Sequence, residues 1–132
     1  MPLTPPLISA LTAGILIVMQ MALALSVALA RRRSRQSLGD GSNKDLLPAI
    51  RRHGNLAENA AIFIAGFTLM EMLGGSRIEL QILCAVFVLA RISHAVGLSM
   101  QNTVNPFRIV GIIATIAVGV ALGVSLIRIG LT

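Results

Sequence analysis

The sequence contains no tryptophan and no tyrosine, and four phenylalanines are its only aromatic residues. The aromatic belt that usually marks the ends of membrane helices is therefore missing, and no mechanism that needs a phenol is possible. A single cysteine, Cys84, excludes an intrachain disulfide. Charged residues make up only 12% of the chain, against about 25% in soluble domains. This scarcity of charge excludes an ordinary soluble fold.

Apolar residues are what the chain has in abundance. Hydrophobic side chains make up 55% of the sequence, and the mean hydropathy is +0.85. Such a composition cannot coat a folded domain with polar groups, so lipid must coat it. A helix needs about 20 mostly apolar residues to cross the hydrocarbon core. We therefore expect an all-α integral membrane protein, a bundle of four transmembrane helices at about residues 7–30, 46–73, 78–99 and 107–128.

Basic residues are distributed unevenly. Seven of the eleven lie between Arg31 and Arg52, none precedes Arg31, and the connection between the second and third helices holds only Arg77. Because basic loops stay in the cytoplasm during insertion, we expect the first and third connections to be cytoplasmic and both termini to be non-cytoplasmic. Most of the cluster from Arg31 to Arg35 is explained as a topology determinant that contacts anionic lipid.

Polar side chains gather on one face of the second helix. Arg51, Asn55 and Glu58 stand at positions i, i+4 and i+7, so they form a stripe that descends from the cytoplasmic surface into the bilayer. A charged residue at the centre of a membrane helix costs about 2.5–3.5 kcal/mol. Glu58 is therefore expected to face protein or water and to mark a functional site.

The third and fourth helices carry the other candidates. Arg91 and His94 share a face, antiparallel packing brings them to the depth of the stripe, and Arg108 adds a cation there. A purely structural alternative stays open, in which Glu58 forms an ion pair with Arg91 that only holds the bundle together. No metal site is expected, because His53 and His94 lie on different helices without a partner at a recognisable ligand spacing.

This set of side chains suits a small anionic ligand that also carries an ammonium group. Arginines bind carboxylates through two parallel hydrogen bonds, and Glu58 can pair with the ammonium group. A polar ligand can enter from the cytoplasm and an apolar one from the bilayer. No glycine-rich phosphate loop, nucleophile elbow or pair of catalytic carboxylates is found, and no nucleic-acid partner is expected.

Four motifs resemble those of the MAPEG family, the membrane-associated proteins of eicosanoid and glutathione metabolism. The stretch from Arg51 to Asn59 resembles the family signature R-x-H-x-N-x-x-E-[NY], and Leu38-Gly39-Asp40-Gly41 resembles the L-G-D-G segment of its bacterial branch. Residues 90–94 resemble its A-R-x-x-H motif, and residues 105–108 its arginine at the start of the fourth helix. The motifs occur in the family's order, and the resemblance covers about residues 7–128.

The resemblance implies one MAPEG-like membrane domain over residues 1–132, assembled as a homotrimer in a bacterial inner membrane with its active site toward the cytoplasm. Glutathione, as cosubstrate, would lie between protomers. Arg108 would stabilise the glutathione thiolate as the catalytic residue. The residues implied in glutathione binding are Arg31, Arg51, Asn55, Glu58, Arg91 and His94.

The sequence departs from the family at two positions. Family enzymes usually have tyrosines where this chain has Asn59 and Leu98. The first prediction is a glutathione-dependent, transferase-like membrane protein that conjugates or reduces apolar electrophiles or peroxides arriving from the lipid. The alternative is a non-catalytic protein of the same fold that binds glutathione or lipid. A small proton-coupled exporter is disfavoured, because Glu58 shares its face with the fixed cation of Arg51.

Overall fold

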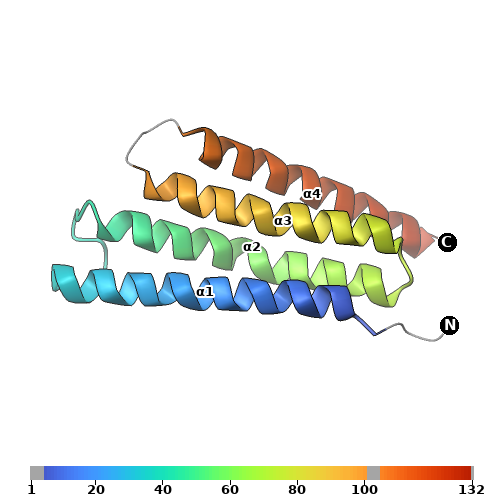
Figure 1. Ribbon diagram of the computed structural model, residues 1–132, viewed down its shortest axis with the longest axis horizontal. Coiled ribbons are helices and arrows are strands. Elements are labelled where there is room, and N and C mark those ends of the chain that lie inside the picture. Colours follow the sequence, from blue (N-terminus) through green and yellow to red (C-terminus); the bar gives the residue numbers. More distant parts are fainter. Residues whose placement is uncertain (1–4, 101–104, 132) are drawn as a thin grey trace.

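The computed structural model describes residues 5–100 and 105–131, so residues 1–4, 101–104 and 132 of the predicted domain lie outside the described residues. The described chain is all α-helical, as predicted, with no strand (Figure 1). The four helices are α1 (Leu7–Ser34), α2 (Leu46–Met72), α3 (Arg77–Ser99) and α4 (Pro106–Leu131). The helix α1 continues four residues past the predicted end, because Arg31 and the residues after it are good helix formers beyond the apolar run.

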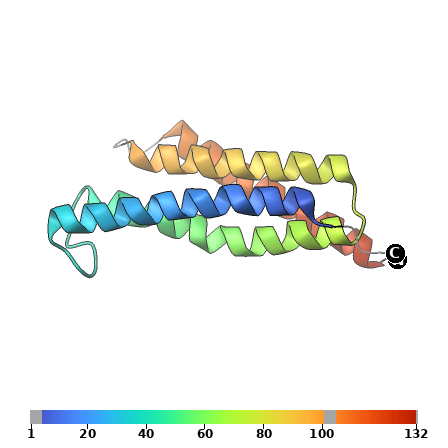
Figure 2. The same cartoon turned by 60° about the horizontal axis from the view of Figure 1, so that its bottom comes forward.

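The helices run antiparallel to their neighbours along the chain (Figure 1). The helices α3 and α4 approach each other along the greatest part of their length, followed by α1 and α2. Figure 2 shows α1 beside both α2 and α3. The end of α1 and the beginnings of α2 and α4 lie together at one end of the bundle, which we call the basic end because Arg31, Arg51 and Arg108 are all there.

Three helices, α1, α3 and α4, are long and apolar enough to cross a membrane. The helix α2 is of similar length but more polar, because its first half carries Arg51, Arg52 and Glu58 and its last turn carries Glu71. The chain is therefore a membrane protein in which α2 is the most polar of the four helices.

The few aromatic side chains form the centre of the bundle. Phe63 stacks on Phe87 with ring centroids 4.1 Å apart, and Phe67 meets both rings at steeper angles. Phe67 and Phe87 are fully buried. Aromatic pairs of this kind contribute about 0.5–1.5 kcal/mol beyond the area they bury. Three of the four phenylalanines thus hold α2 against α3 rather than marking a membrane interface.

A carboxylate from α2 caps the beginning of α1 at the end of the bundle opposite the basic end. Glu71 accepts hydrogen bonds from the backbone N–H groups of Ile8 and Ser9, at 2.9 and 2.8 Å, and from the Ser9 hydroxyl at 2.6 Å. The first N–H groups of a helix have no partner within that helix, and a negative charge there is stabilised by the helix dipole. Glu71 therefore fixes α1 to the end of α2.

We expect Glu71→Gln to lower the free energy of unfolding by about 1–2 kcal/mol, because an amide has one acceptor oxygen and no charge to offer the helix terminus. Thermal unfolding of the detergent-solubilised protein measures this loss. Glu58→Gln is the matched control, since it makes the same change on the same helix at a carboxylate that caps no helix in the described part of the chain. Equal unfolding midpoints for the two variants would contradict the capping role.

Candidate functional site

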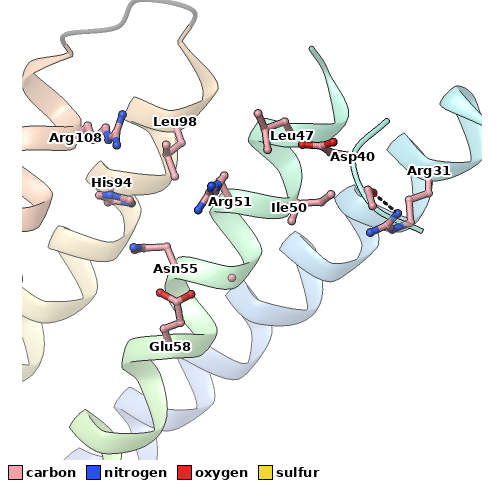
Figure 3. Close-up of a pocket in the computed structure, with 12 residues that line it drawn as sticks. Arg31, Asp40, Leu47, Ile50, Arg51, Asn55, Glu58, His94, Leu98 and Arg108 are labelled. Carbon is pink, nitrogen blue, oxygen red and sulfur yellow. Dashed lines mark hydrogen bonds between the residues drawn. The ribbon is translucent and has the colours of Figure 1, made fainter. Parts of the chain in front are cut away.

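An open cavity of about 600 Å³ lies at the basic end and brings together residues from all four helices and the first connection (Figure 3). Six of the seven side chains predicted for the site line it. The lining comprises Arg31, Gly39, Asp40, Leu47, Ile50, Arg51, Gly54, Asn55, Glu58, His94, Leu98 and Arg108. We refer to it as the first cavity.

The stripe on α2 forms the floor of the first cavity. Arg51, Gly54, Asn55 and Glu58 follow one another along the same face of the helix, as the i, i+4, i+7 spacing requires. Figure 3 shows the three longer side chains gathered beside the first half of α2, with His94 and Arg108 on the side of α3 and α4. Arg51 and Glu58 are exposed on the single chain, whereas His94 is buried.

The position of Arg108 depends on how closely α4 approaches α3. Asn105, itself buried, accepts a hydrogen bond from the Phe107 N–H through its side chain and from the Arg108 N–H through its backbone carbonyl. A Cβ atom added at Gly97 would lie 2.6 Å from the Arg108 nitrogen. Since real Cβ atoms do not approach so closely, the absence of a side chain at Gly97 allows the first turn of α4 to pack there.

Arg31 shapes the wall on the far side of α2. Its guanidinium donates hydrogen bonds to the backbone carbonyls of Gln36, Ser37 and Gly39, at 3.3, 3.2 and 2.9 Å. These bonds fold the first connection back over the basic end, so that Gly39 and Asp40 line the cavity (Figure 3). Arg31 therefore positions the loop as well as contributing positive charge.

Arg91 lies behind the lining rather than in it. It is 3% exposed and donates from Nη1 to Asn55 Oδ1 at 2.5 Å. Its Nη2 donates to the Gly111 carbonyl at 3.2 Å and to the Thr115 hydroxyl. Among the described residues, the hydrogen bonds of Arg91 go to Asn55, Gly111 and Thr115 and not to Glu58. Arg91 therefore pairs with Asn55 instead of forming the structural ion pair with Glu58 that the sequence left open.

Several lining residues were not singled out in the sequence. Asp40 reaches the cavity only because the first connection folds back, and Leu47 and Ile50 line it because they lie on the first turns of α2 next to the stripe. The L-G-D-G segment was the only signal for Asp40. Leu98 lines the wall at a position where the family usually has tyrosine, and its side chain offers only apolar surface there.

The charges of the first cavity favour an anionic ligand with one positive group. Arg31, Arg51 and Arg108 outnumber the carboxylates of Asp40 and Glu58. Guanidinium groups bind carboxylates well because their paired N–H groups match the two oxygens. Within the part of the chain that the structure describes, no three side chains that bind metals lie together.

Comparison with known proteins supports the resemblance of the motifs. The model of the MAPEG family matches residues 9–128, which is nearly the whole chain and includes every residue predicted for the site. No significant match was found among curated proteins or among solved structures.

Proposed function

The chain belongs to the MAPEG family, and from that premise we propose that it is a membrane-bound, glutathione-dependent, transferase-like enzyme. Its substrates would be apolar electrophiles or peroxides that arrive from the bilayer. The observation that carries the proposal is the convergence of Arg51, Asn55, Glu58, His94 and Arg108 on one cavity at the basic end.

Glutathione has the chemistry that this cavity favours, because it combines two carboxylates, one ammonium group and a thiol. Arg51 is placed to bind a carboxylate, and Glu58 to accept hydrogen bonds from the ammonium group. A free thiol has a pKa of about 8.5 and is mostly protonated at neutral pH. A guanidinium such as that of Arg108 lowers the pKa of a nearby thiol, so more of the nucleophilic thiolate is present. The thiolate sulfur attacks the electrophilic carbon and forms a C–S bond, while the leaving group departs with its electron pair or, in an addition, the adduct takes up a proton. With a peroxide, the thiolate attacks one oxygen and breaks the O–O bond, which releases an alcohol or water after protonation. A second glutathione then reduces the resulting sulfenic acid, giving glutathione disulfide and water.

The exposure of Glu58 supports a homotrimer in which the cavity is completed by a second protomer. Glu58 lies about 18 Å from the start of α2 along its axis, near the middle of the helix. If α1 and α3 cross the membrane in the same direction, α2 must return across it, which places Glu58 at membrane depth. An ionised carboxylate there is unfavourable against lipid, so a neighbouring copy of the chain is the expected cover.

The distribution of charge supports the orientation that we propose for the trimer. The basic end holds most of the arginines and would face the cytoplasm. The first cavity would then open toward the cytoplasmic glutathione pool, and a bacterial inner membrane is the location that we propose.

A non-catalytic role is the second candidate, and two side chains favour it. Asn59 donates its amide to the Asn55 carbonyl of its own helix at 2.8 Å, and Leu98 presents only carbon to the cavity. Neither can supply the phenol that family enzymes usually have at these positions. A glutathione thiolate absorbance in the ultraviolet would favour the enzyme, whereas glutathione binding without this signal would favour the non-catalytic protein.

We expect glutathione to raise the thermal unfolding midpoint of the solubilised protein, because a ligand at 100 times its Kd adds about 2.7 kcal/mol of stability. Glu58→Gln should remove most of this shift, since the ligand's ammonium group then loses its ionic partner. The unfolding midpoint without glutathione should stay unchanged. Glu71→Gln is the converse control. Its unfolding midpoint without glutathione should be lower, and glutathione should still raise that midpoint. A full glutathione shift in Glu58→Gln would contradict the assigned role of Glu58.

A further inference from the structure

A second basic cavity, of about 610 Å³, lies on the other side of α2 from the first. Its α2 residues are Pro48, Ala49 and Arg52, whereas the first cavity uses Arg51 and Asn55. Successive helix positions are rotated by about 100°, so Arg51 and Arg52 serve different cavities. The proposed function makes no use of this second cavity.

The charges of the second cavity suit a phosphate group. Arg33, Lys44 and Arg52 line it against the single carboxylate of Asp45. The amide of Asn43 also lines it, whereas the hydroxyls of Ser26, Ser34 and Ser99 donate to backbone carbonyls of their own helices. Arg52 donates from Nη1 to the Ser99 hydroxyl at 2.6 Å, while its Nε is buried without a hydrogen-bond partner.

The second cavity lies where the apolar run of α1 gives way to its polar last turn. Ser26 and Leu29 belong to the apolar run of α1, which ends at Ala30, and Arg33 and Ser34 follow it on the same helix. A lipid headgroup meets the protein at this depth. Leu25 and Leu29 are exposed on α1, as expected for a surface that faces lipid.

A separate apolar groove lies between α1 and α3, nearer the opposite end of the bundle. A cavity of about 430 Å³ is lined by Ile8, Leu11, Thr12 and Ile15 of α1 and by Gln81, Cys84, Ala85, Val88 and Leu89 of α3. On α1, Thr12 and Ser26 are separated by two heptads and so share a face, as do Ala85 and Ser99 on α3. From Ile15 to Ser26 the helix rises about 16 Å, close to half the thickness of the hydrocarbon core.

We propose that the second cavity binds the phosphate of an anionic phospholipid, whose acyl chain lies in the groove between α1 and α3. The three basic side chains recognise the phosphate. The apolar groove distinguishes a lipid from a free anion, because only a lipid fills both. The α1–α3 face is thus a specific lipid site, beyond the general attraction of an arginine cluster for anionic membrane.

The test is a titration of the detergent-solubilised protein with phosphatidylglycerol, phosphatidylcholine or inorganic phosphate, followed by native mass spectrometry. We expect phosphatidylglycerol to bind more tightly than phosphatidylcholine, and inorganic phosphate not to compete at the same concentration. Arg33→Gln/Lys44→Gln should weaken phosphatidylglycerol binding about 25-fold, about fivefold for each cation. The matched control is Arg32→Gln/Arg35→Gln, which removes equal charge from exposed residues outside the lining.

Three results would overturn this proposal. These are equal binding of the two lipids, equal weakening in the two double variants, and displacement of phosphatidylglycerol by inorganic phosphate. Arg52→Gln provides a further test at a half-buried position. Arg33 and Lys44 are exposed, so their replacement does not disturb packing. The thermal shift with glutathione should persist in Arg33→Gln/Lys44→Gln, which separates this test from that of the proposed function.

Discussion

Replacing Arg108 with alanine is expected to reduce glutathione-dependent turnover about 100-fold to 1,000-fold, the usual loss when one group that stabilises a developing or resting anion is removed. The thiolate absorbance on adding glutathione should disappear with it. Glutathione affinity should fall much less, because Arg51, Asn55 and Glu58 still bind the peptide part of the ligand. Turnover with a panel of apolar electrophiles, measured beside the thiolate signal, tests this expectation.

Two control variants separate the charge of Arg108 from its other effects. Arg108→Lys keeps the positive charge and should retain part of the thiolate signal. Arg128→Ala removes an arginine from the last turn of the same helix, at the opposite end of the bundle, and should leave turnover unchanged. Full turnover in Arg108→Ala would refute its catalytic role. Glutathione binding without turnover in the unmodified protein would support the non-catalytic candidate instead.

The positions of the helices were predictable because apolar runs of sufficient length admit few other structures in a membrane. The ends of the helices were less predictable. The helix α1 extends to Ser34 because arginines sustain a helix after the apolar run has ended, and its end is fixed by Arg35 in the left-handed conformation. Hydropathy carries no information about such an end.

The part of the site on a single helix was the easiest to predict. The spacing of Arg51, Asn55 and Glu58 places them on one face whatever the rest of the fold does. The approach of Arg108 needed the packing of α4 against Gly97, and the presence of Asp40 needed a folded loop. These depend on contacts between distant parts of the chain, which spacing along one helix cannot reveal.

Glu71 and Arg91 show why charge alone misplaces a residue. Glu71 was not singled out in the sequence, because the N–H groups that it caps belong to a different helix. Arg91 shares a face with His94, and the sequence led us to expect both in the binding site. The structure turns His94 into the lining and Arg91 toward α4, where the Gly111 carbonyl and the Thr115 hydroxyl accept its hydrogen bonds.

Replacing Arg91 with methionine is expected to destabilise the protein by about 2–4 kcal/mol and to weaken glutathione binding at least tenfold. The substitution leaves Asn55 Oδ1 without its donor and removes one of the hydrogen bonds of the Thr115 hydroxyl and of the Gly111 carbonyl. A buried polar group that loses its partner costs about 1–3 kcal/mol. The guanidinium also lies 5.8 Å from the Phe87 ring centroid, so packing is lost with the charge. Thermal unfolding and a glutathione titration measure the two effects.

The weaker binding should arise through Asn55, because Arg91 is buried behind that residue and outside the cavity lining. A double-mutant cycle tests this route. If Arg91 acts only by orienting Asn55, then Arg91→Met in an Asn55→Ala background should weaken glutathione binding little further. If Arg91 touches the ligand itself, as the family resemblance implies, the two losses should add. Additive losses would therefore show that Arg91 binds glutathione directly. Non-additive losses would show that Arg91 acts by positioning Asn55.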